Sequence, residues 1–454
     1  NQRRDIRSNV RPDIPPLVAL GHIDIAALTR SLQSGINAEI RMALDTLATV
    51  SNSPFPQLNI QLKFCDDLVE ALVDCAEEQL EFLAEHTLEV SYEVQLSSYE
   101  EVVRACRLEQ WAIKEIPVVG TNDYQLDRAV ERLICITTIL RNLSFPGDHA
   151  DNHVVLADEM IVKFLSTLIR YLGTRNMLLR THANTLDLMK DLVIMLSNIA
   201  GSVELPNREH ALCLLQFLLA FSPSSAPLRI DAALSFPSFE PGVHTYLPHA
   251  VDAMAKLLAR DEPNRTHYKA IFALDVTSEP DYDLLSRAFA LSISTIPNVN
   301  QERYRTPTLP SLVDTRRPYL MQGLLVAEII VSMAPSSESS LVRSWISPEN
   351  GLVQSLYKLL RDLCMRFEQP PAYNRNVTRG PPRKDPEHVY LAVLISSVLR
   401  RLAEKAYDPH DRKSVPVPMI PSSQALMDSM SLSSPEWTTE GLLRQLSVCF
   451  NLGQ

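Results

Sequence analysis

The residues with spacing suited to a metal ion are His149, Asp151 and His153. Two histidines four positions apart can share a cation when both lie on one helix face. Here, however, the segment directly follows Pro146-Gly147, which ends a helix, and precedes the next helix. Asp151 is explained more simply as a helix cap or a loop acid. We therefore expect no metal site.

The remaining titratable residues do not form a recognisable catalytic pattern. Acidic pairs such as Asp66-Asp67 and Glu77-Glu78 are adjacent in sequence, and adjacent side chains on a helix diverge by roughly 100°, so we interpret them as solvated faces. The sequence contains no P-loop, HExxH, GxSxG, Rossmann glycine pattern or EF-hand loop. We therefore expect no enzyme, no cofactor and no small-molecule substrate; an enzyme with an unrecognised site is the weakest hypothesis.

Composition narrows the remaining classes of protein. The 454 residues carry a formal net charge of -11, which makes duplex DNA an unfavourable partner for this chain. The seven cysteines are scattered and form no CxxC pair, as expected in a reducing intracellular compartment. Trp111, Trp345 and Trp437 lie far apart; we favour core positions for them over interface anchors. The most apolar window, Leu320 to Ala334, is too short to span a membrane.

Helical periodicity dominates the chain. Leu126, Val130, Leu133, Ile136, Leu140 and Leu143 step by three and four and share one face, with Asp123 as a plausible cap. The same reasoning predicts about sixteen helices, near 23–34, 37–51, 62–85, 98–112, 126–143, 157–172, 184–200, 207–221, 247–260, 264–275, 281–294, 318–333, 339–346, 351–367, 386–406 and 436–450. Residues 88–95 alternate apolar and polar side chains, which predicts a short strand or an extended connector.

Proline-rich connectors interrupt these helices. We expect an extended N-terminal tail over 1–19 and a single helical domain over 20–454. We interpret the long Pro/Ser-rich loops as insertions in that domain, near 222–243, 297–318, 370–386 and 409–435. An alternative is that these loops lie along the domain and are ordered by partners.

Two helices end with nearly the same residues. Leu140-Arg141-Asn142-Leu143-Ser144 matches Leu196-Ser197-Asn198-Ile199-Ala200 at an offset of about 56 residues, somewhat longer than an armadillo unit of about 40–47. These endings resemble the third helix of an armadillo repeat, where an asparagine faces the concave groove and can bond a passing backbone. Asn142 and Asn198 are thus candidate partner-binding residues; the alternative is that both are ordinary C-terminal helix residues.

The block from Glu131 to Leu205 resembles a specific family. It carries Glu131-Arg132-Leu133-Ile134-Cys135-Ile136, then Ile139-Leu140-Arg141-Asn142-Leu143-Ser144-Phe145, and later Leu196-Ser197-Asn198-Ile199-Ala200-Gly201. These runs resemble the C-terminal region of the ARID-bearing large subunit of SWI/SNF chromatin remodellers. The connector Thr174–Arg180 lacks the Trp-rich stretch of the animal members, which indicates a distant, fungal relative.

That resemblance implies a fold and a role. It implies an all-α, armadillo-like helical-repeat solenoid that acts as a non-catalytic nuclear scaffold. The implied partners are other SWI/SNF core subunits, including the helical segment of the ATPase, with no direct DNA binding by this piece and no membrane. The DNA-binding ARID would lie upstream in a longer chain. The alternatives are the armadillo region of the sister remodeller's ARID subunit, or a cytoplasmic armadillo or HEAT adaptor that binds a peptide.

Overall fold

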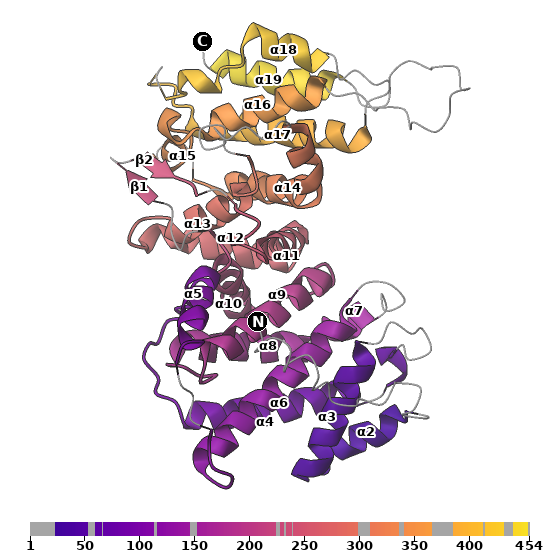
Figure 1. Cartoon of the computed structure of the whole chain (residues 1–454). Coiled ribbons are helices and arrows are strands. Elements are labelled where there is room, and N and C mark those ends of the chain that lie inside the picture. The colour runs from indigo at the N-terminus through magenta and orange to yellow at the C-terminus, as the bar shows by residue number, and fades with distance from the viewer. Residues whose placement is uncertain are drawn as a thin grey trace, which may run out of the picture. The chain divides into compact units, whose positions relative to one another are not determined.

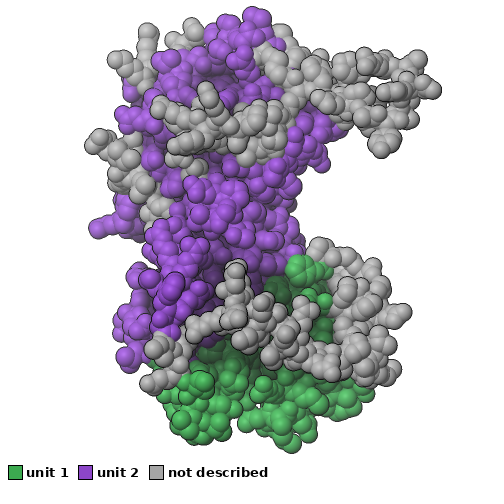
Figure 2. All heavy atoms as spheres, viewed as in Figure 1, with its two compact units in different colours: residues 1–87, 115–156 green, residues 88–114, 157–454 purple. Residues whose placement is uncertain are grey.

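The structure, a computed structural model, is almost entirely helical. It describes residues 23–52, 60–65, 67–112, 116–145, 152–223, 228–230, 233–237, 239–297, 309–335, 340–365, 385–411, 414–430 and 439–452. Within these ranges it contains 18 α-helices and one two-stranded hairpin, as the all-α prediction requires. Contacts divide the chain into two compact units, unit 1 (1–87 and 115–156) and unit 2 (88–114 and 157–454) (Figure 2).

Unit 1 is organised around one long helix, α6, which packs against α3 and α4. All six residues of the predicted apolar face of α6 are buried. The helix begins earlier than predicted and its cap is Thr121, whose side chain accepts a hydrogen bond from the Tyr124 N–H, while Asp123 lies in the first turn. The described helices of this unit are α2 (Ile25–Leu32), α3 (Asn37–Ser51), the 3-10 helix η3 (Leu62–Phe64), α4 (Leu68–Glu85), α6 (Asn122–Leu143) and α7 (Asn152–Leu156).

Unit 2 contains a row of helices in which each packs against the next: α9, α11, α14, α17 and α19 (Figure 1). Other helices cover this row, with α13 on α14 and α16 on α17, while α10 packs against both α8 and α12. The described α-helices of unit 2 are α5 (Tyr99–Glu109), α8 (Glu159–Thr174), α9 (His182–Ile199), α10 (Arg208–Leu219), α11 (Leu247–Ala259), α12 (Asn264–Leu274), α13 (Asp283–Ile293), α14 (Leu309–Met333), α15 (Leu341–Trp345), α16 (Leu352–Met365), α17 (Pro386–Ala406), α18 (Ser423–Met430) and α19 (Thr439–Leu452).

Shorter elements fill the connections of unit 2. They are the antiparallel strands β1 (Leu228–Ile230) and β2 (Ala233–Ser235) and the 3-10 helices η4 (Asp275–Thr277), η5 (Pro348–Asn350) and η6 (Val417–Met419). The hairpin lies in a connector for which the sequence predicts only a loop. Helices α7 and α18 are likewise missing from the sequence prediction, because α7 follows a Pro-Gly connector and α18 lies in a region interpreted as a Pro/Ser-rich insertion.

Residues 88–95 form an extended connector, one of the two predicted alternatives. The Val90 N–H donates to the Thr174 carbonyl and the Asn176 N–H donates to the Leu88 carbonyl, with a single bridge between Glu89 and Arg175. The connector approaches the end of α8 closely, because a Cβ added at Gly173 would lie 2.7 Å from Val94 Cγ1. A single pair of extended segments is not stable alone, so this pairing depends on the adjoining helix α8.

Several predictions fall partly or wholly on residues outside the described ranges. These are the N-terminal tail 1–19, residues 298–308 of the insertion near 297–318, most of the insertion near 370–386, and parts of the insertions near 222–243 and 409–435. Residues 309–318, predicted as part of an insertion, instead form the beginning of α14, so that prediction is wrong there. No helix in the part of the chain that the structure describes combines the length and apolar character needed to cross a membrane.

Candidate functional site

The first candidate residue, Asn142, is buried in unit 1 at the end of α6. Only 4% of it is exposed, and its Nδ2 donates to the Ser51 hydroxyl at the end of α3, 3.1 Å away. Its Oδ1 accepts a 2.7 Å hydrogen bond from the guanidinium of Arg141. Asn142 thus joins the ends of two helices, and a partner could reach its amide only by displacing these contacts. Its predicted role in partner binding stays a prediction.

The second candidate, Asn198, is half-buried at the end of α9 in unit 2. The residues around it differ from those around Asn142. The neighbouring Ser197 hydroxyl donates to Asp252 Oδ2 of α11 over 2.7 Å, and the ammonium of Lys256 donates to the Ser197 carbonyl. Lys256 also pairs with Asp252 at 2.7 Å. The two helix ends that match in sequence therefore use different side chains to contact their neighbours.

A polar stripe on α11 makes these contacts. His249, Asp252, Lys256 and Arg260 are spaced by three and four residues and so share one face. Arg260 extends the stripe by donating to the Gly201 carbonyl and pairing with Glu204. Cations placed against the C-terminal carbonyls of α9 complement both the unpaired acceptors and the helix dipole there. Sequence reasoning missed this stripe, because its spacing is that of an ordinary solvated helix face.

The same arrangement occurs further along the row of helices. On α17, Ser397 and Arg401 both donate to Glu328 of α14, and Lys405 donates to the Ala334 carbonyl just beyond the end of α14. Burial, together with the neighbouring Arg401, lowers the pKa of Lys405. At two positions in unit 2, a lysine from the following helix therefore caps the preceding helix.

Two buried asparagines, absent from the sequence prediction, make matching backbone contacts. Asn152 at the start of α7 accepts from the Leu62 N–H and donates to the Ile60 carbonyl. Asn264 at the start of α12 accepts from the Leu205 N–H and donates to the Val203 carbonyl. Each amide pairs with residues i and i+2 of an extended tripeptide, as a neighbouring strand would. The tripeptide 60–62 leads into η3 of unit 1, and the tripeptide 203–205 precedes α10 of unit 2.

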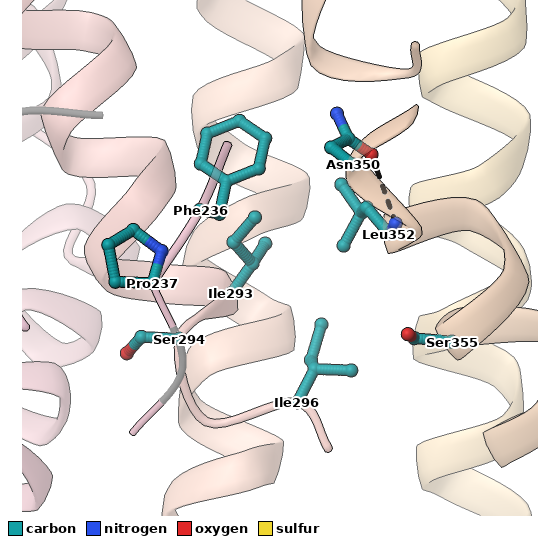
Figure 3. Close-up of a pocket in the computed structure, with 8 residues that line it drawn as sticks. All are labelled: Phe236, Pro237, Ile293, Ser294, Ile296, Asn350, Leu352 and Ser355. Carbon is teal, nitrogen blue, oxygen red and sulfur yellow. Dashed lines mark hydrogen bonds between the residues drawn. The ribbon is translucent and has the colours of Figure 1, made fainter. Parts of the chain in front are cut away.

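Two cavities in the described part of unit 2 differ in size. One has a volume of about 30 Å³ and lies between Phe236, Ile293 and Ser355; Asn350, at its edge, accepts from the Leu352 N–H (Figure 3). It is large enough for about one or two waters. A hollow of about 490 Å³ is lined by Asp158, Glu159 and Glu204 among others.

The three carboxylates of that larger hollow already have partners. Asp158 caps α8 by accepting from the Met160 N–H. Glu159 pairs with Lys163 and Glu204 pairs with Arg260. They therefore serve helix ends and ion pairs, and the hollow does not present a pair of carboxylates set up for acid–base chemistry.

Of the three residues with metal-like spacing, His149, Asp151 and His153, the structure describes only His153. His153 lies on α7 and its Nε2–H donates to the Ser144 carbonyl at 2.7 Å, whereas His149 and Asp151 lie outside the described residues. Among the described residues, no group of three or more His, Cys, Asp or Glu side chains could hold a metal ion. All seven cysteines are free thiols. Burial raises the pKa of Cys75 to about 11 and that of Cys213 to about 12, which keeps these thiols protonated and unreactive.

The three tryptophans differ in how they are placed. Trp345 is fully buried, as expected for core, and stacks on Phe289. Trp111 is 88% exposed just beyond the end of α5, so the core prediction is wrong for this residue. Trp437 lies outside the described residues. The sequence around Trp111 lacks the clear apolar period that identifies a buried face. That absence was the sequence feature that could have indicated an exposed tryptophan.

These features define a class: an α-helical protein whose clustered polar side chains cap helices and join them to their neighbours. Comparison with known proteins then identifies relatives of this chain. The chain is 30% identical over 380 residues to the SWI/SNF chromatin-remodeling complex subunit sol1 of Schizosaccharomyces pombe, a match covering 78% of this chain. It is 27% identical over 159 residues, 34% of this chain, to the SWI/SNF chromatin-remodeling complex subunit SWI1 of Saccharomyces cerevisiae. The chain is a homologue of these fungal SWI/SNF subunits.

The match covers only part of each relative. The aligned region spans 41% of the length of the first relative and 12% of the second. No protein-family model matches the chain. Both relatives are named as subunits of a complex and neither as an enzyme. The resemblance predicted from residues 131–205 is thus confirmed as homology to fungal SWI/SNF subunits.

Proposed function

We propose that this chain is a non-catalytic, armadillo-like scaffold within a SWI/SNF-type chromatin-remodelling complex. The observation that carries the proposal is the similarity to a SWI/SNF subunit over 78% of the chain. The same similarity favours SWI/SNF over the sister remodeller, because both relatives are named as SWI/SNF subunits. On this proposal the protein acts in the nucleus.

The architecture of unit 2 supports the armadillo-like part of the proposal. Stacked helical repeats bury a continuous core only by packing each unit on the next, which is the pattern of the row from α9 to α19. The capping lysines Lys256 and Lys405 recur within this row, as a repeated structural unit would produce. We propose accordingly that residues 20–454 form one helical-repeat domain with loop insertions.

Such a scaffold would bind proteins rather than nucleic acid. Its proposed partners are the other core subunits of the complex, including the helical segment of the ATPase. The formal charge of -11 supports binding to proteins over binding to nucleic acid, because an acidic surface repels phosphate.

Affinity purification of the tagged full-length protein from nuclear extract tests the proposal. We expect an ATPase and several further core subunits to be recovered together with the chain. Recovery of the chain alone would overturn the scaffold function. Recovery with cytoplasmic cargo instead would favour the peptide-binding adaptor.

The two asparagines can be tested separately within the same experiment. Because Asn142 is bonded to Ser51, we expect Asn142→Ala to lower the free energy of unfolding by about 1 kcal/mol. Because Asn198 is only half-buried, we expect Asn198→Ala to weaken partner recovery with little change in stability. Unchanged recovery with Asn198→Ala would remove this residue from the proposed binding surface.

A further inference from the structure

Among the described residues of unit 2, the most exposed aromatic side chains lie close together in sequence, within 88–112. Tyr92 is 94% exposed and Trp111 is 88% exposed, and Leu108 is 74% exposed on the last turn of α5. Leu108 and Trp111 are three residues apart, and the Trp111 N–H donates to the Leu108 carbonyl, so the helical turn continues and both side chains share one face. A tryptophan left in water costs free energy that binding would recover.

The opposite side of α5 is held firmly. Tyr99 at its start stacks on Phe221 and meets Tyr246 edge-on, and its N–H donates to the Ala220 carbonyl. At its end, Glu109 accepts hydrogen bonds from both the backbone N–H and the Nδ1–H of His182, the first residue of α9. The helix is therefore fixed at both ends, which reduces the entropy that a partner must remove on binding.

The carboxylates of α5 are all used within unit 2. Glu101 completes a capping box with Ser98, Glu109 binds His182, and Glu100 pairs with Arg104. Arg107 is exposed and lies four residues before Trp111, so it shares a face with that residue, and it has no ion pair among the described residues. The exposed face of α5 therefore combines two apolar side chains with an uncompensated positive charge, in a chain that is acidic as a whole.

We propose that this face, formed by Arg104, Arg107, Leu108 and Trp111 and called here the Trp111 face, binds an acidic amphipathic helix of another protein. A convex helix face packs best against a second helix, whose apolar side chains recur at the same three- and four-residue spacing. Carboxylates beside that apolar stripe would pair with Arg107 and compete with Glu100 for Arg104. Trp111 would be the central anchor of the contact. This inference rests on the proposed function and identifies one binding surface of the scaffold.

The test uses the full-length protein in its assembled complex. A photo-crosslinking phenylalanine derivative, which keeps an aromatic ring at the anchor position, replaces Trp111. A second protein carries the same group at Val417, which is 79% exposed elsewhere in unit 2, as the control. We expect position 111 to crosslink to one subunit, at a helix that carries acidic and apolar residues. The control at position 417 should not crosslink to that helix.

Charge reversal provides the second readout. We expect Arg107→Glu to weaken retention of the crosslinked subunit about tenfold, and acid-to-lysine exchange on its helix to restore it. Lys358→Glu, on an exposed site of α16, is the matched control and should have no effect. An intact complex with no crosslink at 111, a crosslink to a basic segment, or retention unchanged by Arg107→Glu would overturn this proposal alone. A protein that purifies without companions would overturn both this proposal and the scaffold function.

Discussion

At the scale of single residues, the asparagines show what a sequence pattern can and cannot find. Asn142 and Asn198 stand out because similar residues precede and follow them. Asn152 and Asn264 make nearly identical contacts in space, yet their surroundings, Asn152-His153-Val154 and Asn264-Arg265-Thr266, share nothing beyond the asparagine. The tripeptide that each amide binds lies 59 to 92 positions away, and Asn152 also donates to the Leu143 carbonyl nine positions before it. Only the folded chain brings these groups together, so no local pattern could predict them.

We predict that removing the side-chain amide of Asn264 lowers the stability of the protein substantially. It is fully buried and satisfies one donor and one acceptor of the tripeptide Val203–Leu205. We expect Asn264→Ala to leave both groups unpaired and to lower the free energy of unfolding by about 2–3 kcal/mol. Urea unfolding measures this difference. Asn122→Ala, at an exposed asparagine of α6, should cost far less, and equal losses would show that Asn264 has no special role.

At the scale of elements, the positions of most helices could be predicted from the sequence, because apolar residues at three- and four-residue spacing face a core. The start of α14 shows the limit of that reasoning. Proline suggests a helix start at Pro318, but the helix begins at Leu309 and continues through Pro318. Val313 and Arg316, in the turns before the proline, are buried. Tertiary packing there offsets the hydrogen bond that proline removes, and such packing is not visible in a local pattern.

Gly323 of α14 determines how closely this helix approaches α13. A Cβ at this position would overlap the Ser292 carbonyl oxygen and lie 2.9 Å from Thr295 Oγ1. We expect Gly323→Ala to force the helices apart and to lower the free energy of unfolding by about 1–3 kcal/mol. Gly441→Ala in α19, where no atom lies within 4 Å, should instead be neutral or stabilising by up to about 1 kcal/mol. Thermal unfolding of both variants checks the difference, and equal effects would contradict a close approach at Gly323.

The contact between α5 and α9 predicts a dependence on pH. Burial alone would raise the pKa of Glu109, but the combined hydrogen bonds from His182 outweigh it and lower the pKa below its ordinary value of 4.5. A carboxylate with a lowered pKa stabilises the fold above its unfolded pKa, and this contribution is lost as the pH falls through the folded pKa.

We therefore expect Glu109→Gln to lower the thermal midpoint at pH 7 and to have a much smaller effect in acid, where Glu109 is protonated in the folded protein as well. Glu93→Gln, on the exposed connector before α5, is the control and should show no such pH dependence. A Glu109→Gln effect that is equal at neutral and acid pH would contradict the hydrogen-bonded carboxylate at Glu109.

At the scale of the whole molecule, the division into units could not be predicted from composition. Unit 1 and unit 2 are each built from two separate segments of the chain, because 88–114 belongs to unit 2 while 115–156 returns to unit 1. No change in composition marks residues 87, 114 or 156. Residues 88–114 belong to unit 2 because of contacts such as that between Tyr99 and Phe221, which are 122 positions apart. Homology to SWI/SNF subunits, by contrast, was visible in the block from Glu131 to Leu205.

Because residues 88–114 are a separate segment of unit 2, we predict that a peptide of this segment can bind to the rest of the unit. Fragment 157–454 lacks α5, and without it Phe221 and Tyr246 lose their contacts with Tyr99 and the end of α8 loses its backbone pairing with Val90. We expect a synthetic peptide of residues 88–112 to bind the fragment and raise its free energy of unfolding by RT ln(1 + [L]/Kd), about 2.7 kcal/mol at a hundredfold excess over Kd, so that its thermal midpoint rises with peptide concentration. The same peptide with Tyr99→Ala should bind more weakly, because it lacks the aromatic contacts. Equal binding of the two peptides, or a midpoint unaffected by either, would show that α5 is not an integral part of unit 2.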